Sequence, residues 1–441
     1  MITAKKNDKG LYQNISLSLI IAMFYIFFSL SGSTGQKSLY ISIGLLILWV
    51  TVALLSNAEA FYNAISTRQV KAFIVYLFFY TFTAVFVGGV VYTLKLVGSA
   101  LIMFSPMIIY LYYRRLDPKK LKLILIVSLI FFCYLVINSL LFYSIHENAA
   151  RQLAAGTEKF GDLAIGGGYT LAYGSTILGI YLIDLLFNSV IKKKKYKIIT
   201  IIAIVLLCYL VISTKSTLTI LWFFIGAILS LFLRYPSFKN GLDLEKNKNN
   251  FLLNLFKIIS FLFLAVLFFI SYEKIGLWIL NQTIGSSDVV SMRLRDIGES
   301  MAFGIQNSEY LKMRLEIPLK SLSSFLDNPL VGRGFEYGYA WEDTYLYLGG
   351  HSEWADAIGR MGILGGVPYF LIFLFAVKDE RRFSGNYIPV TYGWTFLLLG
   401  IFNPLSGFPT MFTLMFIIPS LSFFLFNRFK KYQENANIQV K

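Results

Sequence analysis

Charged residues are scarce in this chain. They make up 15% of its 441 residues, whereas hydrophobic residues make up 56% and the mean hydropathy is +0.64. A soluble globular protein carries roughly 25% charged and 45–50% apolar residues, so this much apolar surface cannot be hidden in an aqueous core. The composition excludes a soluble enzyme, a disordered chain and a domain with a single membrane anchor. It predicts an all-α polytopic membrane protein.

Cysteine is almost absent, and so are the common catalytic motifs. Cys133 and Cys208 both fall inside apolar runs, which predicts two buried thiols packed between helices rather than a disulfide or a CxxC metal site. The sequence also lacks a phosphate-binding GxxxxGK[ST] loop, an HExxH motif, a GxSxG motif and a Cys/His cluster with zinc spacing. We therefore expect neither a cofactor nor a metal.

Long apolar runs are plentiful, and about 12 of them could cross a bilayer. Each should be a helix, because backbone polar groups in hydrocarbon need internal partners. The first run lacks a small-residue cleavage site, so we expect it to be retained. The runs lie at about Ile15–Ser31, Leu39–Ser56, Ala72–Val91, Leu94–Tyr113, Leu123–Ser144, Gly168–Phe187, Ile198–Ser213, Leu218–Leu233, Leu252–Ser271, Ile363–Val377, Ile388–Phe402 and Met411–Phe426.

The basic residues indicate which side of the membrane each loop occupies. About two thirds of the 40 Lys and Arg residues fall in the loops of one side, which the positive-inside rule assigns to the cytoplasm. Both termini are therefore expected in the cytoplasm. The formal net charge of +16 is largely a topology signal, and no nucleic-acid partner is expected.

One connection is much longer than most of the others. We expect residues 1–271 to hold the first nine spans, residues 272–362 to form one large extracytoplasmic loop, and residues 363–441 to hold three more spans and a cytoplasmic tail. Long connections tend to be functional. Within the loop, Leu315 begins a run of leucines at helical spacing that ends before Asn328-Pro329. That run predicts an amphipathic helix lying at the membrane surface.

His351 is the first candidate for chemistry in this loop. It follows two glycines and precedes Ser352-Glu353, which is typical of a helix N-terminus, and such a terminus favours anions. Histidine titrates near neutral pH, which suits a general base, and the carboxylate of Glu353 could tune or share the proton transfer. The alternative is a structural histidine.

Four cations are candidates for binding a phosphorylated substrate. Arginine matches phosphate oxygens with a bidentate fork, and lysine offers a point charge. The alternatives are salt bridges within the loop for the arginines and snorkelling to the interface for the lysine, which lies in a tight outer turn. The four residues are Arg293, Arg295, Arg314 and Lys215.

A set of segments resembles O-antigen polymerases and ligases. Asp327–Gly334 is similar to the asparagine-proline and glycine segment of that family, and His351-Ser352 followed by Gly362–Gly366 is similar to its histidine and glycine motif before a span. Arg314 matches the arginine at the head of the preceding family helix. Ser213–Leu221 resembles an outer turn of the family, with Thr-Lys in place of Ser-Arg. Together, these segments resemble those of an O-antigen polymerase (Wzy-like) of the O-antigen polymerase/ligase superfamily.

The resemblance implies a GT-C-like fold with about 12 transmembrane helices and a glycosyltransferase in the bacterial cytoplasmic (inner) membrane, with its site facing the periplasm. Such enzymes move a glycan from undecaprenyl pyrophosphate to a sugar hydroxyl without a metal. Arg314 and Lys215 would hold the pyrophosphate, and His351 would deprotonate or orient the acceptor. Arg293, Arg295 and Glu353 have no motif match and are chosen because they lie nearby in the sequence.

Two branches and one other class remain open. In the polymerase branch the acceptor is another lipid-linked repeat unit, and in the ligase branch it is lipid A-core. The abundant aromatic residues favour the polymerase, whose implied partners are a chain-length regulator (polysaccharide co-polymerase), a flippase and membrane lipid. The other class is a lipid-linked oligosaccharide flippase. Charge concentrated in one outer loop, with almost none deep in the spans, favours an enzyme over a transporter.

Overall fold

The computed structural model describes most of the chain, and the described residues form helices joined by turns. These residues are 2–29, 36–146, 168–187, 191, 193–214, 216–232, 270–285, 289–304, 309–334, 348–350, 352–383, 390–405 and 409–425. No β-strand occurs within these ranges, so the all-α prediction is confirmed for them.

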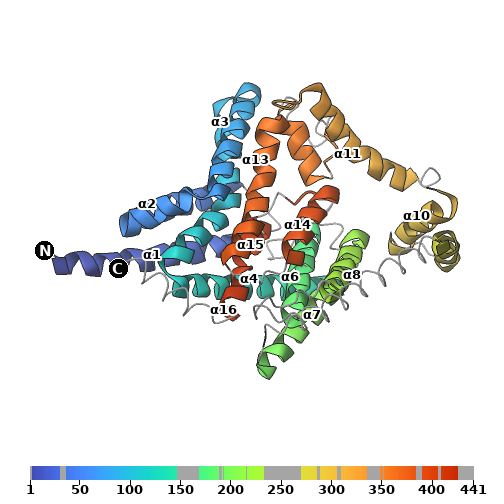
Figure 1. The fold of residues 1–441 in the computed structure, drawn as a ribbon, viewed down its shortest axis with the longest axis horizontal. Helices are drawn as coiled ribbons and strands as arrows, with labels where there is room; N and C mark the ends of the chain where they lie inside the picture. The colour runs from blue at the N-terminus through green and yellow to red at the C-terminus, as the bar shows by residue number, and fades with distance from the viewer. Residues whose placement is uncertain are drawn as a thin grey trace, which may run out of the picture.

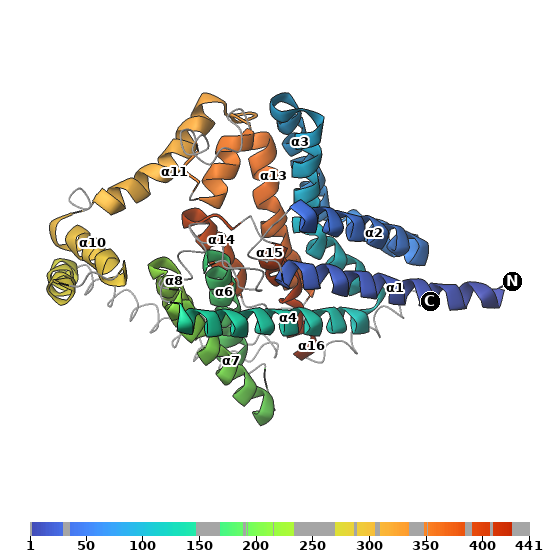
Figure 2. The same ribbon diagram turned by 180° about the vertical axis from the view of Figure 1, so that it is seen from behind.

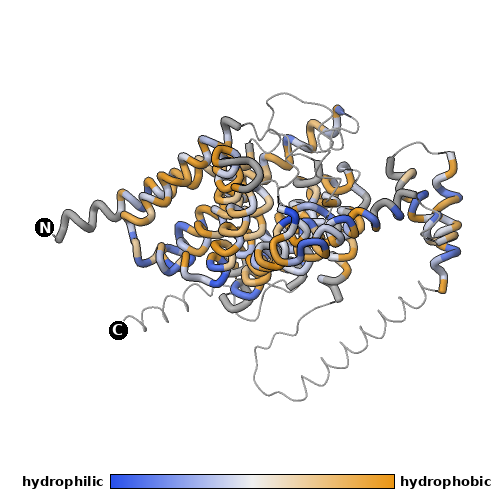
Figure 3. The backbone as a smooth tube through the Cα atoms, turned by 90° about the horizontal axis from the view of Figure 1, so that it is seen from above, coloured by the Kyte–Doolittle hydropathy of each residue, from blue (hydrophilic) through white to orange (hydrophobic). Residues whose placement is uncertain are grey.

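The helices are numbered as in Figure 1. They are α1 (Ile2–Ser29), α2 (Gln36–Ile65), α3 (Arg68–Leu116), α4 (Pro118–Ile145), α6 (Gly168–Phe187), α7 (Lys194–Ser213), α8 (Thr217–Phe232), α10 (Val289–Phe303), α11 (Glu309–Asp327), α13 (Glu353–Phe383), α14 (Val390–Phe402), α15 (Pro409–Ile417) and α16 (Ser420–Leu425). A further helical segment spans residues 270–283. Apolar positions recur along the described helices, with hydrophilic positions between them (Figure 3).

By length and composition, six described segments could cross a bilayer, although the last of them reverses direction at Gly362. Their apolar character identifies a membrane protein. The predicted spans at 388–402 and 411–426 coincide with the shorter helices α14, α15 and α16. The predicted ninth span, Leu252–Ser271, lies almost entirely outside the described residues. The six segments are Gly10–Phe28, Ser38–Ile65, Val90–Leu116, Pro118–Ile145, Lys194–Ser213 and Glu353–Asp379.

Helix α3 folds back on itself. The rings of Phe73 and Phe104 have centroids 4.6 Å apart, and those of Tyr76 and Phe104 are 5.9 Å apart. In one straight helix, residues 73 and 104 would lie about 46 Å apart. The two ends of α3 therefore run side by side as antiparallel arms (Figures 1 and 2). These arms coincide with the predicted spans Ala72–Val91 and Leu94–Tyr113.

Helix α13 also reverses direction, at Gly362, whose φ of 59° and ψ of −162° lie outside the helical region. The ring of Trp354, before the break, lies 5.1 Å from that of Phe370 and 5.5 Å from that of Phe373, both after it. The sequence predicted a helix N-terminus at Glu353, which is confirmed, but not the reversal. We call residues 353–361 the short arm, residues 363–383 the long arm, and the whole the α13 hairpin.

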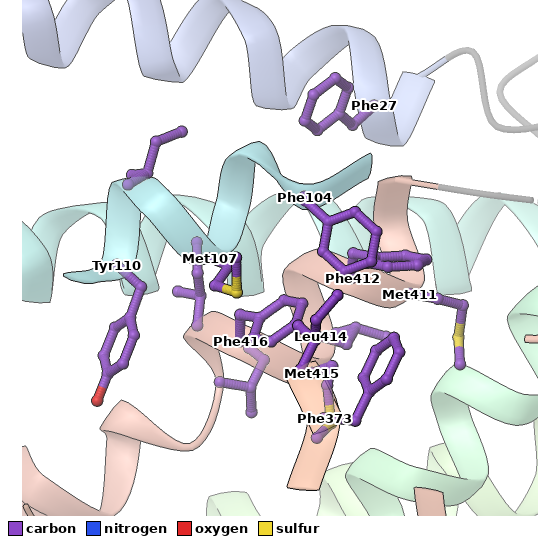
Figure 4. Packing of buried hydrophobic residues seen from close by; sticks show 14 of the residues in the cluster. Phe27, Phe104, Met107, Tyr110, Phe373, Met411, Phe412, Leu414, Met415 and Phe416 are labelled. Carbon is purple, nitrogen blue, oxygen red and sulfur yellow. The ribbon is translucent and has the colours of Figure 1, made fainter. Parts of the chain in front are cut away.

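An aromatic cluster holds the long arm in place. Phe373 packs against Phe104 of α3, at 6.0 Å between ring centroids, and against Phe412 and Phe416 of α15, at 5.8 and 5.9 Å. Figure 4 shows these side chains converging, with Phe27 of α1 nearby. Each aromatic pair contributes about 0.5–1.5 kcal/mol beyond the burial of its area. The cluster therefore fixes the α13 hairpin to the membrane helices.

The prediction of two buried cysteines is wrong for Cys133. It is exposed on α4, beside exposed Ile130, Tyr134 and Ile137, and Cys208 is half-buried on α7. Both thiols are free. The error has a physical cause, because an apolar run in a membrane helix can face lipid as well as protein, and sequence alone does not separate the two.

Candidate active site at the α13 hairpin

The two glycine-containing segments that resemble the family lie against each other. The segment 329–334 wraps the tip of the α13 hairpin, where the short arm ends and the long arm begins. Its carbonyls accept from the first amides of the long arm, and its amides donate to the last carbonyls of the short arm, groups that a helix end leaves unpaired. The bonds are Ile363 N–H to Pro329 O (2.9 Å), Leu364 N–H to Leu330 O (3.1 Å), Arg333 N–H to Gly359 O (3.1 Å) and Gly334 N–H to Arg360 O (2.7 Å).

Glycine is required where these backbones meet. Gly362 and Gly332 both have positive φ angles, 59° and 67°, which side chains rarely tolerate. A Cβ atom on Gly362 would lie 2.3 Å from the carbonyl group of Leu330, and one on Gly332 would lie 2.4 Å from the carbonyl carbon of Arg360. The glycines of the two motifs therefore let one backbone approach the other.

Helix α11 packs against the same hairpin and against the residues that precede His351. A Cβ on Gly349 would lie 2.0 Å from the carbonyl oxygen of Ile317, and a Cβ on Gly359 would lie 2.6 Å from that of Ser321. Helix α11 ends at Asp327, just before Asn328-Pro329, as predicted. The packing brings the backbone of α11 directly onto the loop that carries His351 and onto the short arm.

Arg314 belongs to α11, one turn before Ile317. By helical periodicity, positions 314, 317 and 321 share one face of α11, and Ile317 and Ser321 lie against Gly349 and Gly359 of the loop and the short arm. The side chain of Arg314 and all of His351 lie outside the described part of the chain. The segments that carry the two residues are nevertheless neighbours.

A carboxylate that the sequence did not single out binds the backbone on both sides of His351. Asp356, one turn into the short arm, accepts hydrogen bonds from the amides of Gly350 (3.2 Å) and Ser352 (3.3 Å). It also accepts from the hydroxyl of Ser321, and that hydroxyl accepts from the amide of Gly349 (2.8 Å). No local signal marked Asp356, because it lies four residues after Ser352, whereas a capping box places the acidic residue three residues after the N-cap.

Glu353, the second predicted catalytic residue, is buried, with 6% of its surface exposed. Its carboxylate accepts from the hydroxyl of Tyr369 (2.5 Å) and the amide of Leu405 (2.6 Å). Its own amide donates to the carbonyl of Asn403 (3.2 Å), whose side-chain oxygen accepts from Tyr173 (2.6 Å). Glu353 therefore ties the two arms of the hairpin to the segment that follows α14.

The other predicted cations lie on separate elements. Lys215 falls between α7 and α8, outside the described residues. Arg293 and Arg295 belong to α10. One end of α11 packs on the α13 hairpin, and α10 lies past the opposite end (Figures 1 and 2). The guanidinium of Arg295 donates to the carbonyl of Thr283, so it ties α10 to the helical segment before it. The side chain of Arg293 is not described.

A metal site is not found where the structure gives side-chain positions. Within the described ranges, no group of three or more His, Cys, Asp or Glu side chains could hold a metal ion. The buried carboxylate of Glu353 and the half-buried carboxylate of Asp356 instead accept hydrogen bonds from hydroxyl and amide groups.

A known protein family matches the part of the chain that contains the site. A family model described as O-antigen ligase matches residues 202–370, a range that includes the α7–α8 turn, α11, the segment 329–334 and the tip of the α13 hairpin. A comparison with curated proteins finds no match. The family match confirms, for residues 202–370, the predicted resemblance to the O-antigen polymerase/ligase superfamily.

Proposed function

We propose that this protein is a surface-polysaccharide polymerase. It transfers a growing glycan from undecaprenyl pyrophosphate to the terminal sugar of another lipid-linked repeat unit. The observation that carries the proposal is the family match over residues 202–370, together with the contact between the two glycine motifs inside that range. The family implies a transferase or ligase that acts on lipid-linked polysaccharide, and the polymerase is the more specific proposal.

The proposed reaction needs one base and at least one cation. The acceptor hydroxyl oxygen bonds to the anomeric carbon of the donor while the bond from that carbon to the pyrophosphate oxygen breaks. His351 takes the hydroxyl proton, and Arg314 with Lys215 neutralises the charge on the departing pyrophosphate. The backbone contact between α11 and Gly349 supports the pairing of Arg314 with His351, because it makes their segments neighbours.

The remaining predicted residues receive different degrees of support. The buried hydrogen bonds of Glu353 favour a positioning role over direct proton transfer. Arg293 and Arg295 are supported as pyrophosphate ligands only by their place in the sequence, since α10 lies apart from the hairpin. The proposed roles of His351 and Arg314 therefore have the strongest support.

The surface of α11 supports a site at the membrane interface. Its leucine stripe is between 46% and 69% exposed, while Ser321 and Ser324, on the face toward the protein, are 0% and 3% exposed. A helix surrounded by water shows the reverse pattern, so the leucines are suited to lipid. We place this face in the periplasmic leaflet of the bacterial inner membrane, with both termini in the cytoplasm. The stripe consists of Leu315, Leu319, Leu322 and Leu326.

The ligase is the second candidate, because the matching family is described as O-antigen ligase. Deleting the gene and separating the surface glycans on a gel distinguishes the candidates. Loss of the polymer ladder, with one repeat unit kept on lipid A-core, supports the polymerase. Unattached polymer supports the ligase. A complete absence of exported units indicates a flippase and contradicts the proposed function.

A further inference from the structure

We propose that Asp356 is a positioning residue which, with Ser321, clamps the backbone on both sides of His351. The catalytic part of this inference rests on the proposed function, in which His351 is the base. The structural part stands on described contacts alone. We use the name Asp356 clamp for the side chains of Asp356 and Ser321 together with the amides of Gly349, Gly350 and Ser352.

The clamp draws on three elements of the structure. Its carboxylate comes from the short arm of α13, its hydroxyl from α11, and its three amides from the loop between them. Hydrogen bonds that involve an ionised acceptor are stronger than neutral ones. The two carboxylate oxygens reach the amides before and after position 351, so the clamp constrains the backbone that presents His351.

Ordinary helix capping does not account for this arrangement. The hydroxyl of Ser352 already accepts from the amide of Ala355 (3.3 Å) and so serves as the N-cap. The carboxylate of Asp356 reaches back out of the helix to the loop and across to Ser321.

The clamp also joins the loop that carries His351 to α11, the helix that carries Arg314. Ser321 lies two turns after Arg314 on the same face of α11, and its hydroxyl bonds the carboxylate that holds residues 350 and 352. Two side chains therefore fix the backbone of the proposed base relative to the helix of the proposed phosphate ligand. A displacement of about 1 Å at a catalytic group can lower a rate on the order of 10²-fold.

Four variants of the full-length protein in lipid nanodiscs test the clamp. Asp356→Ala removes both acceptor oxygens, Asp356→Asn keeps one, and Ser321→Ala removes the bridge to α11. Asp327→Asn is the matched control, because Asp327 is a carboxylate near the same junction that pairs with Arg333 and takes no part in the clamp. Hydrogen exchange of peptides covering residues 345–352 and transfer kinetics with a lipid-linked repeat unit are measured for each variant.

We expect Asp356→Ala to raise exchange at residues 349–352 and to lower kcat on the order of 10²-fold, with the KM for the donor unchanged. Asp356→Asn should recover part of kcat, and Asp327→Asn should match the unaltered protein in both measurements. If Asp356→Ala fails to fold, Ser321→Ala supplies the same two readouts with a smaller expected change.

Each contrary outcome overturns a different statement. Unchanged exchange in both Asp356→Ala and Ser321→Ala overturns the clamp itself. Raised exchange with normal kcat overturns the positioning role, while His351→Ala measured beside it decides separately whether His351 is the base. Full activity of His351→Ala overturns the proposed base and leaves the exchange result to judge the clamp.

Discussion

The aromatic core and the tip of the α13 hairpin are held together in different ways. In the core, large rings such as Phe104 and Phe373 fill space between α3, α13 and α15. At the tip, backbones touch, and Gly332 and Gly362 leave no room even for a methyl group. Side-chain volume is therefore the constraint in the core, whereas the absence of a side chain is the constraint beside the proposed site.

Truncating the core is expected to have the largest effect on stability. Phe373, which is 1% exposed, contacts rings from three other helices, so Phe373→Ala should destabilise the protein by about 3–5 kcal/mol. Phe373→Leu keeps most of the volume and should cost less than about 1.5 kcal/mol. Thermal unfolding of the purified protein in detergent measures both. Equal losses for the two variants would mean that ring volume is not the constraint.

Adding one methyl group at the hairpin is expected to have the next largest effect. Gly362→Ala combines a positive φ with a Cβ 2.3 Å from Leu330, so it should cost about 2–5 kcal/mol and abolish polymer. Gly285→Ala is the matched control, because Gly285 has a φ of 81° and nothing within 4 Å of its Cβ position. Its cost should be about 1–2 kcal/mol. Similar unfolding temperatures for the two variants would argue against the close backbone contact.

A smaller effect is expected at the buried carboxylate. Glu353→Gln leaves an acceptor for Tyr369 but turns an amide donor toward the N–H of Leu405, which should cost about 1–3 kcal/mol. A positioning role predicts lower stability with only a modest fall in kcat of the folded protein. A variant with a normal unfolding temperature that transfers no glycan would mean that Glu353 takes part directly in proton transfer.

The smallest effect is expected at the exposed ion pair that follows α11. Arg333 and Asp327 are 26% and 47% exposed, and exposed pairs contribute about 0–1 kcal/mol. Asp327→Asn should therefore leave the unfolding temperature and the polymer ladder nearly unchanged, with any difference weakened by salt. A loss comparable to that of Gly362→Ala would show that the pair stabilises the hairpin tip.

Local signals in the sequence predicted much of the architecture near the site. The leucine spacing before Asn328-Pro329 predicted α11 and its end, and Ser352-Glu353 predicted the start of α13. The reversal at Gly362 was missed because its cause lies in a contact with residues 329–334, about 30 positions away in sequence. The sequence contained the required glycines, but not the information that they meet.

The sequence also did not reveal the surroundings of two side chains, Asp356 and Cys133. Asp356 looked like an ordinary polar residue of a helix, because its partners come from α11 and from the loop around His351. Cys133 looked buried because lipid and protein interiors are equally apolar. The number of spans, the sidedness and the roles of Lys215, Arg293, Arg295, Arg314 and His351 stay predictions.

The most direct test of the account is the glycan gel of a deletion strain that carries His351→Ala or Arg314→Ala. The account predicts that both variants are inserted at normal abundance and produce no polymer, because one lacks the base and the other a bidentate phosphate ligand. Arg314→Lys should be impaired as well, since lysine cannot form the fork. A normal ladder from both alanine variants would contradict the proposed site.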